Sequence, residues 1–244
     1  MSAGHIVAMG GGGFLMEPGN PLLDDFVLSL VPRRPAKVCF LPTASGDSAL
    51  NLVKFYRAFS TRALATDVTV FDPPSLPRQP ARTADIPDVL AGQDVIYVGG
   101  GSTVNLLAIW RAQGIDRALR AAWEGGAILC GVSAGMLCWF RDGLTDSFGG
   151  LLPVGDGLGF IDASASPHYD AATGRRAAYH EAIENGLPPG YAADDGAALH
   201  FRGTEFVEAV ASRENARAYF VERVNGGVRE TRLPVRYLGR GAGA

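Results

Sequence analysis

Short, uninterrupted apolar runs recur along the first half of this 244-residue chain, and each one ends at glycine, proline or aspartate. Stretches in which apolar residues recur at helical spacing separate these runs. Strands that are apolar at every position are buried on both faces. The alternation therefore predicts an α/β fold with a doubly wound, mostly parallel sheet and helices on both faces. The expected strands are Ile6–Met9, Val38–Leu41, Val68–Phe71, Val95–Val98 and the run Ala127–Cys130.

Turn and capping signals place the remaining elements. Past residue 200 we expect short antiparallel strands added at a sheet edge, and a proline-rich surface loop should cover Pro73–Pro87. No internal repeat or second domain is evident, so residues 1–244 are expected to form one domain, frayed from Gly239 onward. The expected helices start at Pro21 after Asn20, at Asp47, at Val104, at Asp116 and at about Ala171, and the late strands are Phe206–Ala211, Ala218–Val224 and Val228–Leu233.

Composition limits the possible classes of function. A net charge of −3 offers no basic surface for nucleic acid, and no apolar run is long enough to span a membrane. Cys39, Cys130 and Cys138 lie in apolar segments without metal-ligand spacing, which favours a reducing compartment. The first residues lack the pattern of a secretory signal. We therefore expect a cytoplasmic protein without a metal or a cofactor.

A G-x-S-x-G motif, Gly131-Val132-Ser133-Ala134-Gly135, lies between an apolar strand and the apolar run Met136–Phe140. In a strand-to-helix turn this pattern forms a nucleophile elbow, because the glycines allow a sharp turn that presents the serine hydroxyl. Ser133 is therefore the candidate nucleophile. The backbone N–H of Ala134 is a candidate donor to the oxyanion that forms after attack on a carbonyl.

Two glycine runs follow expected strands. Gly10–Gly13 does not fit the G-x-G-x-x-G spacing of a dinucleotide site, and Glu17-Pro18-Gly19 argues against a helix directly after the glycines. We expect this run to allow close backbone packing near the site. Gly99–Gly101 follows another strand and can supply the second oxyanion donor; Gly100 is favoured, with Gly99 and Gly101 as alternatives.

A catalytic serine needs a base and an acid. Among four histidines, His168 stands out, because Pro167 holds the preceding chain extended on a loop. Asp194 and Asp195 form a turn before another expected strand, and neighbouring residues in extended chain point to opposite sides, so one of them can orient the imidazole. Asp195 is the first choice and Asp194 the alternative.

The order of these residues along the chain separates two scaffolds. An esterase of the α/β-hydrolase type runs serine, acid, histidine, which would assign Ser133, Asp170 or Asp195, and His200. The order Ser133, His168, Asp195 belongs to another fold.

With these motifs in place, the chain resembles peptidase family S51, the peptidase E and cyanophycinase group, whose fold is like that of class I glutamine amidotransferases. Six pieces in the family's order carry the resemblance over most of the chain. They are Gly10–Phe14, Phe40–Ala44, Tyr97–Thr103, Gly131–Gly135, Pro167–Tyr169 and Asp194–Leu199.

The resemblance implies a serine peptidase that hydrolyses short peptides through an acyl-enzyme, with Ser133 as nucleophile, His168 as base and Asp195 as third member. Family members often carry glutamate at this last position. Preference for an acidic N-terminal residue is also implied, as in a dipeptidase or aminopeptidase. Arg175, Arg176 and Tyr169 are the tentative substrate-binding residues, although the two arginines follow His168 at a shorter spacing than in peptidase E.

Three alternatives to this interpretation stay open: the α/β-hydrolase-type esterase, a cyanophycinase-like enzyme that cleaves β-linked aspartyl-arginine, and a non-catalytic binding domain. The resemblance is compatible with a homodimer. It implies no cofactor.

Overall fold

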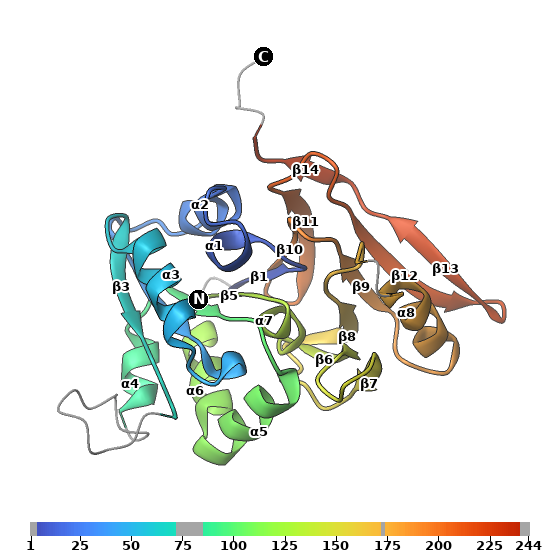
Figure 1. The fold of residues 1–244 in the computed structure, drawn as a ribbon, viewed down its shortest axis with the longest axis horizontal. Coiled ribbons are helices and arrows are strands. Elements are labelled where there is room, and N and C mark those ends of the chain that lie inside the picture. The colour runs from blue at the N-terminus through green and yellow to red at the C-terminus, as the bar shows by residue number, and fades with distance from the viewer. Residues whose placement is uncertain (1–3, 72–84, 172–173, 240–244) are drawn as a thin grey trace.

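A computed structural model describes residues 4–71, 85–171 and 174–239. In these residues two sheets lie side by side (Figure 1). The eight-stranded sheet has the order β14 (Val235–Tyr237), β11 (Glu205–Ala211), β10 (Ala197–Arg202), β1 (His5–Met9), β5 (Ile128–Val132), β4 (Val95–Val98), β2 (Ala36–Leu41) and β3 (Ala63–Asp67). The six-stranded sheet has the order β13 (Gly227–Arg232), β12 (Ala218–Val224), β9 (Gly190–Ala193), β8 (Ile161–Ser166), β6 (Phe140–Thr145) and β7 (Leu152–Val154).

The large sheet is parallel from β1 through β5, β4 and β2 to β3, while β10 pairs antiparallel with β1 and β11 with β10. Alternate residues of each strand enter different cores. Val7 packs with the cluster under α2 (Leu22–Ser29) and α3 (Ala49–Phe59), and Ile6 packs with the cluster under α5 (Thr103–Gln113) and α6 (Ile115–Glu124). The expected doubly wound α/β sheet is therefore confirmed. The helices are α1 (Gly13–Met16), α2 (Leu22–Ser29), α3 (Ala49–Phe59), α4 (Ile86–Ala91), α5 (Thr103–Gln113), α6 (Ile115–Glu124), α7 (Ala134–Leu137) and α8 (Arg175–Glu184).

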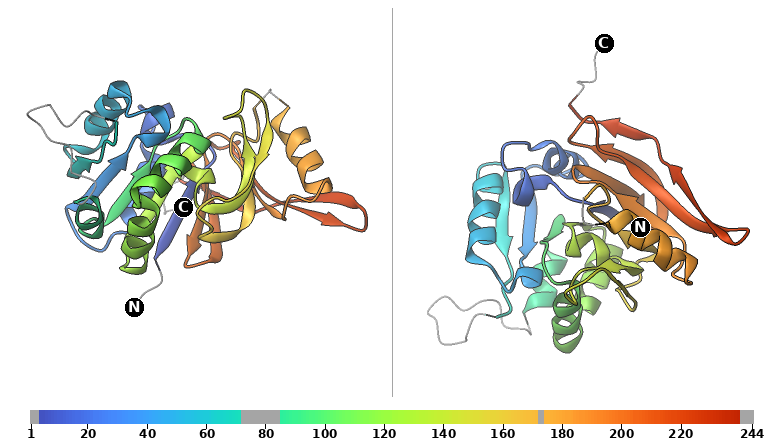
Figure 2. Two further views of the ribbon diagram at one scale, coloured as in Figure 1. Left: turned by 90° about the horizontal axis from the view of Figure 1, so that it is seen from below. Right: turned by 45° about the vertical axis from the view of Figure 1, so that its right-hand side comes forward.

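The second sheet was not predicted. Its strands β6, β8 and β9 run parallel to one another, and the hairpin β12–β13 continues the sheet in antiparallel fashion (Figure 2). Side chains of this sheet, such as Phe140 and Ile161, share a buried cluster with Leu199 of the large sheet. The helix after the elbow, α7, is a single turn that ends at Leu137, and β6 begins at Phe140. The late strands thus divide: β11 extends the large sheet, and β12 and β13 join the second.

Three expected elements differ from the structure. The third strand is β3, which precedes Val68–Phe71; as an edge strand it carries partly exposed polar residues that interrupt its apolar pattern. Helix α3 begins at Ala49, and it buries Phe55 and Phe59 while Val53 is 46% exposed. The helix expected from Ala171 begins at Arg175. Most of the proline-rich loop and the tail from residue 240 lie outside the described residues.

The expectation that no helix follows the first glycine run was wrong. Gly12 and Gly13 take positive φ values of 103° and 59°, and this reversal lets the four-residue helix α1 form before Glu17. The proline that follows Glu17 limits it to a single turn.

Candidate active site

Ser133 lies at the tip of the turn between β5 and α7. Its backbone takes φ 60° and ψ −111°, which is rare for a residue with a side chain and typical of a nucleophile elbow. The turn is possible because Gly131 and Gly135 pack tightly: a Cβ on Gly135 would lie 2.3 Å from the carbonyl oxygen of Val98. The close packing holds Ser133 partly exposed at the carboxyl end of β5.

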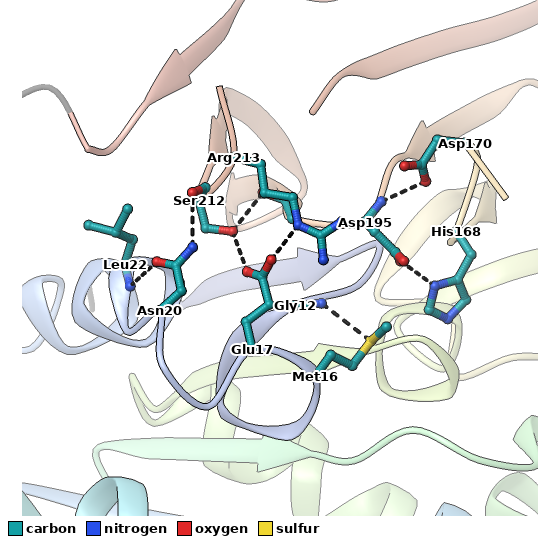
Figure 3. Close-up of polar contacts among 11 residues, drawn as sticks. Gly12, Met16, Glu17, Asn20, Leu22, His168, Asp170, Asp195, Ser212 and Arg213 are labelled. Carbon is teal, nitrogen blue, oxygen red and sulfur yellow. Dashed lines mark hydrogen bonds and ion pairs between the residues drawn. The ribbon is translucent and has the colours of Figure 1, made fainter. Parts of the chain in front are cut away.

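His168 follows the end of β8 and also has a positive φ, of 51°. Its ring Nδ1 lies 2.5 Å from Oδ1 of Asp195, a hydrogen bond between two half-buried side chains (Figure 3). Hydrogen bonding to His168 lowers the pKa of the Asp195 carboxyl below its ordinary value. Asp195 therefore carries a negative charge that can orient the imidazole and stabilise its protonated form.

Asp194 faces the other way from its neighbour. Its Oδ2 accepts a hydrogen bond from the backbone N–H of Arg217 at 2.9 Å, and burial raises the pKa of its carboxyl to about 6. The structure thus brings Asp195, and not Asp194, to His168. The alternation of side-chain direction in extended chain accounts for this division.

The end of β1 anchors both halves of the site. The backbone N–H of Ser133 donates to the carbonyl oxygen of Met9 at 3.1 Å, and that of His168 donates to Gly10 at 3.2 Å. The next residue, Gly11, forms a bridge with Asp195, and a Cβ there would lie 1.9 Å from the Asp195 Oδ1 atom. The expected role of this glycine run in close backbone packing is therefore confirmed.

The second glycine run lies beside the elbow. A Cβ placed on Gly100 would be 3.3 Å from the Ser133 Cβ and 3.7 Å from its Oγ. The N–H of Gly99 donates to the carbonyl oxygen of Leu41, so it is already occupied. Ala134 is the first residue of α7, where backbone N–H groups lack partners within the helix.

In the described part of the chain, neither the Ser133 hydroxyl nor the Nε2 atom of His168 makes a hydrogen bond within 3.5 Å. Hydrogen bonds between catalytic groups commonly shorten only when substrate is bound. Their backbones are nevertheless anchored on Met9, the last residue of β1, and on the next residue, Gly10, which places the two residues at one edge of the sheet.

The tentative substrate-binding residues have protein partners. Arg175 is 4% exposed, donates to the carbonyl oxygen of Leu144 and pairs with Asp146 at 3.0 Å. Arg176 forms an ion pair with Glu230, and the Tyr169 hydroxyl donates to the same carboxylate at 2.6 Å. In the described residues none of these three side chains contacts His168, and Arg175 lies close enough to Asp195 to help lower the pKa of its carboxyl.

Sequence reasoning missed a second polar group beside the candidate triad. Arg213 forms an ion pair with Glu17, and Figure 3 shows its guanidinium between Glu17 and Asp195. On the other side, the Asp170 carboxylate accepts the backbone N–H of Asp195 at 2.9 Å. Arg213 lies in a surface turn without a motif, so only its nearness in the fold could identify it.

His200, the base that an α/β-hydrolase would require, has a different environment. Its Nε2 lies 2.8 Å from Nδ1 of His5, at the start of β1, whereas Ser133 is anchored at the end of that strand. A cavity of about 640 Å³ also opens near His5, at the opposite edge of the sheet from the elbow. The described residues hold no cluster of three potential metal ligands.

Comparisons with known proteins identify the family of the chain. The model of peptidase family S51 matches residues 6–209. A Bacillus subtilis (strain 168) protein, the uncharacterized peptidase YgaJ, is 47% identical over 237 residues, which cover 96% of this chain and 99% of that protein.

Two solved structures share the fold. The crystal structure of a peptidase from an acI-B1 Actinobacterium has a TM-score of 0.68 at 19% identity, covering 96% of this chain and 95% of that one. A candidate peptidase E protein from Listeria monocytogenes EGD-e has a TM-score of 0.60 at 18% identity, covering 84% and 96%. Among the described residues, no helix is long and apolar enough to cross a membrane. The family match over most of the sequence, with a near full-length relative, shows that the chain belongs to peptidase family S51 and is a serine peptidase.

Proposed function

We propose that this serine peptidase hydrolyses short peptides with Ser133 as nucleophile, His168 as general base and Asp195 as the acid that orients it. The observation that carries the proposal is the 2.5 Å hydrogen bond between His168 and Asp195, on a loop that shares the end of β1 with the elbow. The α/β-hydrolase order is disfavoured, because His200 is paired with His5.

In this mechanism His168 accepts the hydroxyl proton of Ser133 as its oxygen attacks the peptide carbonyl. Backbone N–H groups of Gly100 and Ala134 stabilise the oxyanion. The protonated imidazole, stabilised by the Asp195 carboxylate, then gives its proton to the leaving amine. Water activated by the same imidazole hydrolyses the acyl-enzyme and frees Ser133.

We propose that the preferred substrates carry an acidic N-terminal residue. The guanidinium of Arg213 supports this, because it lies near Asp195 and is 44% exposed. All three arginines form ion pairs, Arg213 with Glu17, Arg175 with Asp146 and Arg176 with Glu230. Arg213 is the one of these three that is both exposed and close to Asp195. We also propose a cytoplasmic location, since Cys39, Cys130 and Cys138 are buried, unbridged thiols.

The test is mass spectrometry of products from a mixed library of dipeptides and tripeptides that includes β-linked aspartyl-arginine. Wild type and Ser133→Ala are compared, with Ser29→Ala as a matched control, because Ser29 lies in α2 and its hydroxyl donates to the carbonyl oxygen of Phe26. A fluorophosphonate reagent should label wild type and Ser29→Ala. Equal labelling of Ser133→Ala would show that Ser133 is not the nucleophile. Selective release of products from the β-linked aspartyl-arginine would favour a cyanophycinase-like substrate.

A further inference from the structure

The carboxylate of Glu230 is the centre of a polar cluster outside the triad. It lies on β13, at the edge of the second sheet, and its side chain is only 12% exposed. It accepts the Tyr169 hydroxyl at 2.6 Å and lies 2.9 Å from Nε2 of His180. Arg176 adds an ion pair, with its guanidinium stacked 5.0 Å from the Tyr219 ring.

These contacts favour the charged form of the carboxylate. Burial alone raises the pKa of Glu230, but hydrogen bonds from Tyr169, His180 and Arg176 outweigh it, and the pKa lies below its ordinary value. A charged acceptor forms hydrogen bonds roughly twice as strong as a neutral one. Glu230 is therefore a strong anchor for the groups that reach it.

One of those groups is covalently next to the catalytic base. Tyr169 follows His168, and its side chain is 2% exposed, so its hydroxyl has a fixed position. The backbone of His168 takes φ 51°, a left-handed conformation that is strained in a residue with a side chain and persists only where surrounding contacts hold it. The backbone N–H groups of His168 and Tyr169 bond to Gly10 and Ala193.

Glu230 constrains the side chain of Tyr169, whereas Gly10 and Ala193 constrain the backbone. It comes from the hairpin β12–β13, which packs against α8 (Figure 1), and it contacts neither Ser133 nor Asp195. Resting on the proposed role of His168, we propose that Glu230 is a positioning residue, which through Tyr169 holds the imidazole of His168 in line with Ser133.

The test compares Glu230→Gln with Glu222→Gln on the same hairpin. Glu222 pairs with Arg229 on an exposed face and has no link to Tyr169, so it is a matched control. We expect kcat per titrated active site to fall by roughly tenfold in Glu230→Gln with KM little changed, because a misplacement of about 1 Å can cost about a hundredfold. Glu222→Gln should match wild type. A kcat for Glu230→Gln within about twofold of wild type would overturn the proposal.

A double-mutant comparison tests whether Glu230 acts on His168 through Tyr169. Tyr169→Phe removes only the hydroxyl, so it keeps the packing even if Glu230→Gln folds poorly. It should also lower kcat, and the Tyr169→Phe/Glu230→Gln double variant should be no slower than the worse single variant. Additive losses would show that Glu230 does not act through Tyr169.

A spectroscopic measurement separates this proposal from the proposed function. The Nδ1 proton between His168 and Asp195 should give a low-field ¹H resonance, which Glu230→Gln should shift or broaden and Glu222→Gln should leave unchanged. An unchanged resonance in Glu230→Gln contradicts positioning even if the wild type cleaves no peptide. Lack of peptide cleavage and of Ser133 labelling in the wild type contradicts the proposed function alone.

Discussion

Asp194 and Asp195 are neighbours in the sequence with opposite electrostatic environments. Burial raises the pKa of Asp194 to about 6, whereas the hydrogen bond with His168 lowers that of Asp195. We expect Asp195→Asn to lower kcat by roughly 10³–10⁴, as loss of the triad acid does elsewhere, through the wrong imidazole tautomer. Asp194→Asn should change kcat little. Steady-state kinetics of both variants is the measurement, and equal losses would contradict the assignment.

His200 carries a second residue-scale prediction. Burial, with a smaller contribution from nearby His5, lowers its pKa from the ordinary 6.5 to about 4. Protonation therefore favours the unfolded chain: the contribution of neutral His200 is complete above pH 6.5 and is lost as the pH falls toward 4. Between pH 6.5 and pH 4 this contribution to the free energy of unfolding amounts to at most about 3 kcal/mol. Urea unfolding at several pH values should show that the free energy of unfolding falls less steeply with decreasing pH in His200→Gln than in wild type. An identical pH dependence in the two proteins would contradict this.

At the scale of elements, the loop between β1 and α1 leaves no room for a side chain at Gly11. A Cβ on Gly11 would lie 1.9 Å from Asp195, whereas one on Gly19 meets nothing within 4 Å. Gly11→Ala should therefore destabilise the protein by about 1–3 kcal/mol and lower kcat. Gly19→Ala is the control. Chemical unfolding and peptide hydrolysis measure the two effects, and wild-type values for Gly11→Ala would show that Asp195 can move aside.

The sequence predicts elements well where burial is complete. The runs at β1, β2, β4 and β5 are apolar throughout because helices cover both faces of the sheet, and each was located within two residues. Strand β8 was missed because its sequence Ile-Asp-Ala-Ser-Ala-Ser has small and polar residues, which lack strand preference.

In the candidate site, too, residues that belong to a local pattern could be predicted from the sequence, whereas contacts between distant segments could not. Ser133 could be chosen as the candidate nucleophile because an elbow depends on a local glycine pattern, and His168 as the candidate base because few histidines compete with it. Contacts between distant segments, such as that of Glu230 with Tyr169, depend on the second sheet, which no local sequence pattern predicts.

At the scale of the whole molecule, the two sheets share one buried cluster that joins residues such as Leu129 of β5 and Ala165 of β8. We therefore expect the two sheets to unfold together. Amide hydrogen exchange at rising denaturant should show β5 and β8 losing protection with the same free energy. Earlier loss in β8 would indicate a separate folding unit.

The anchoring of Ser133 and His168 on Met9 and Gly10 has a consequence for redesign. The backbones of the proposed nucleophile and the proposed base are held by the carbonyl groups of two neighbouring residues, whose Cα atoms are about 3.8 Å apart. Insertions or deletions there would change the catalytic spacing directly, however well the rest of the fold tolerated them. An engineer who wants a new specificity can vary the turn around Arg213, but the Met9–Gly10 junction must keep its length.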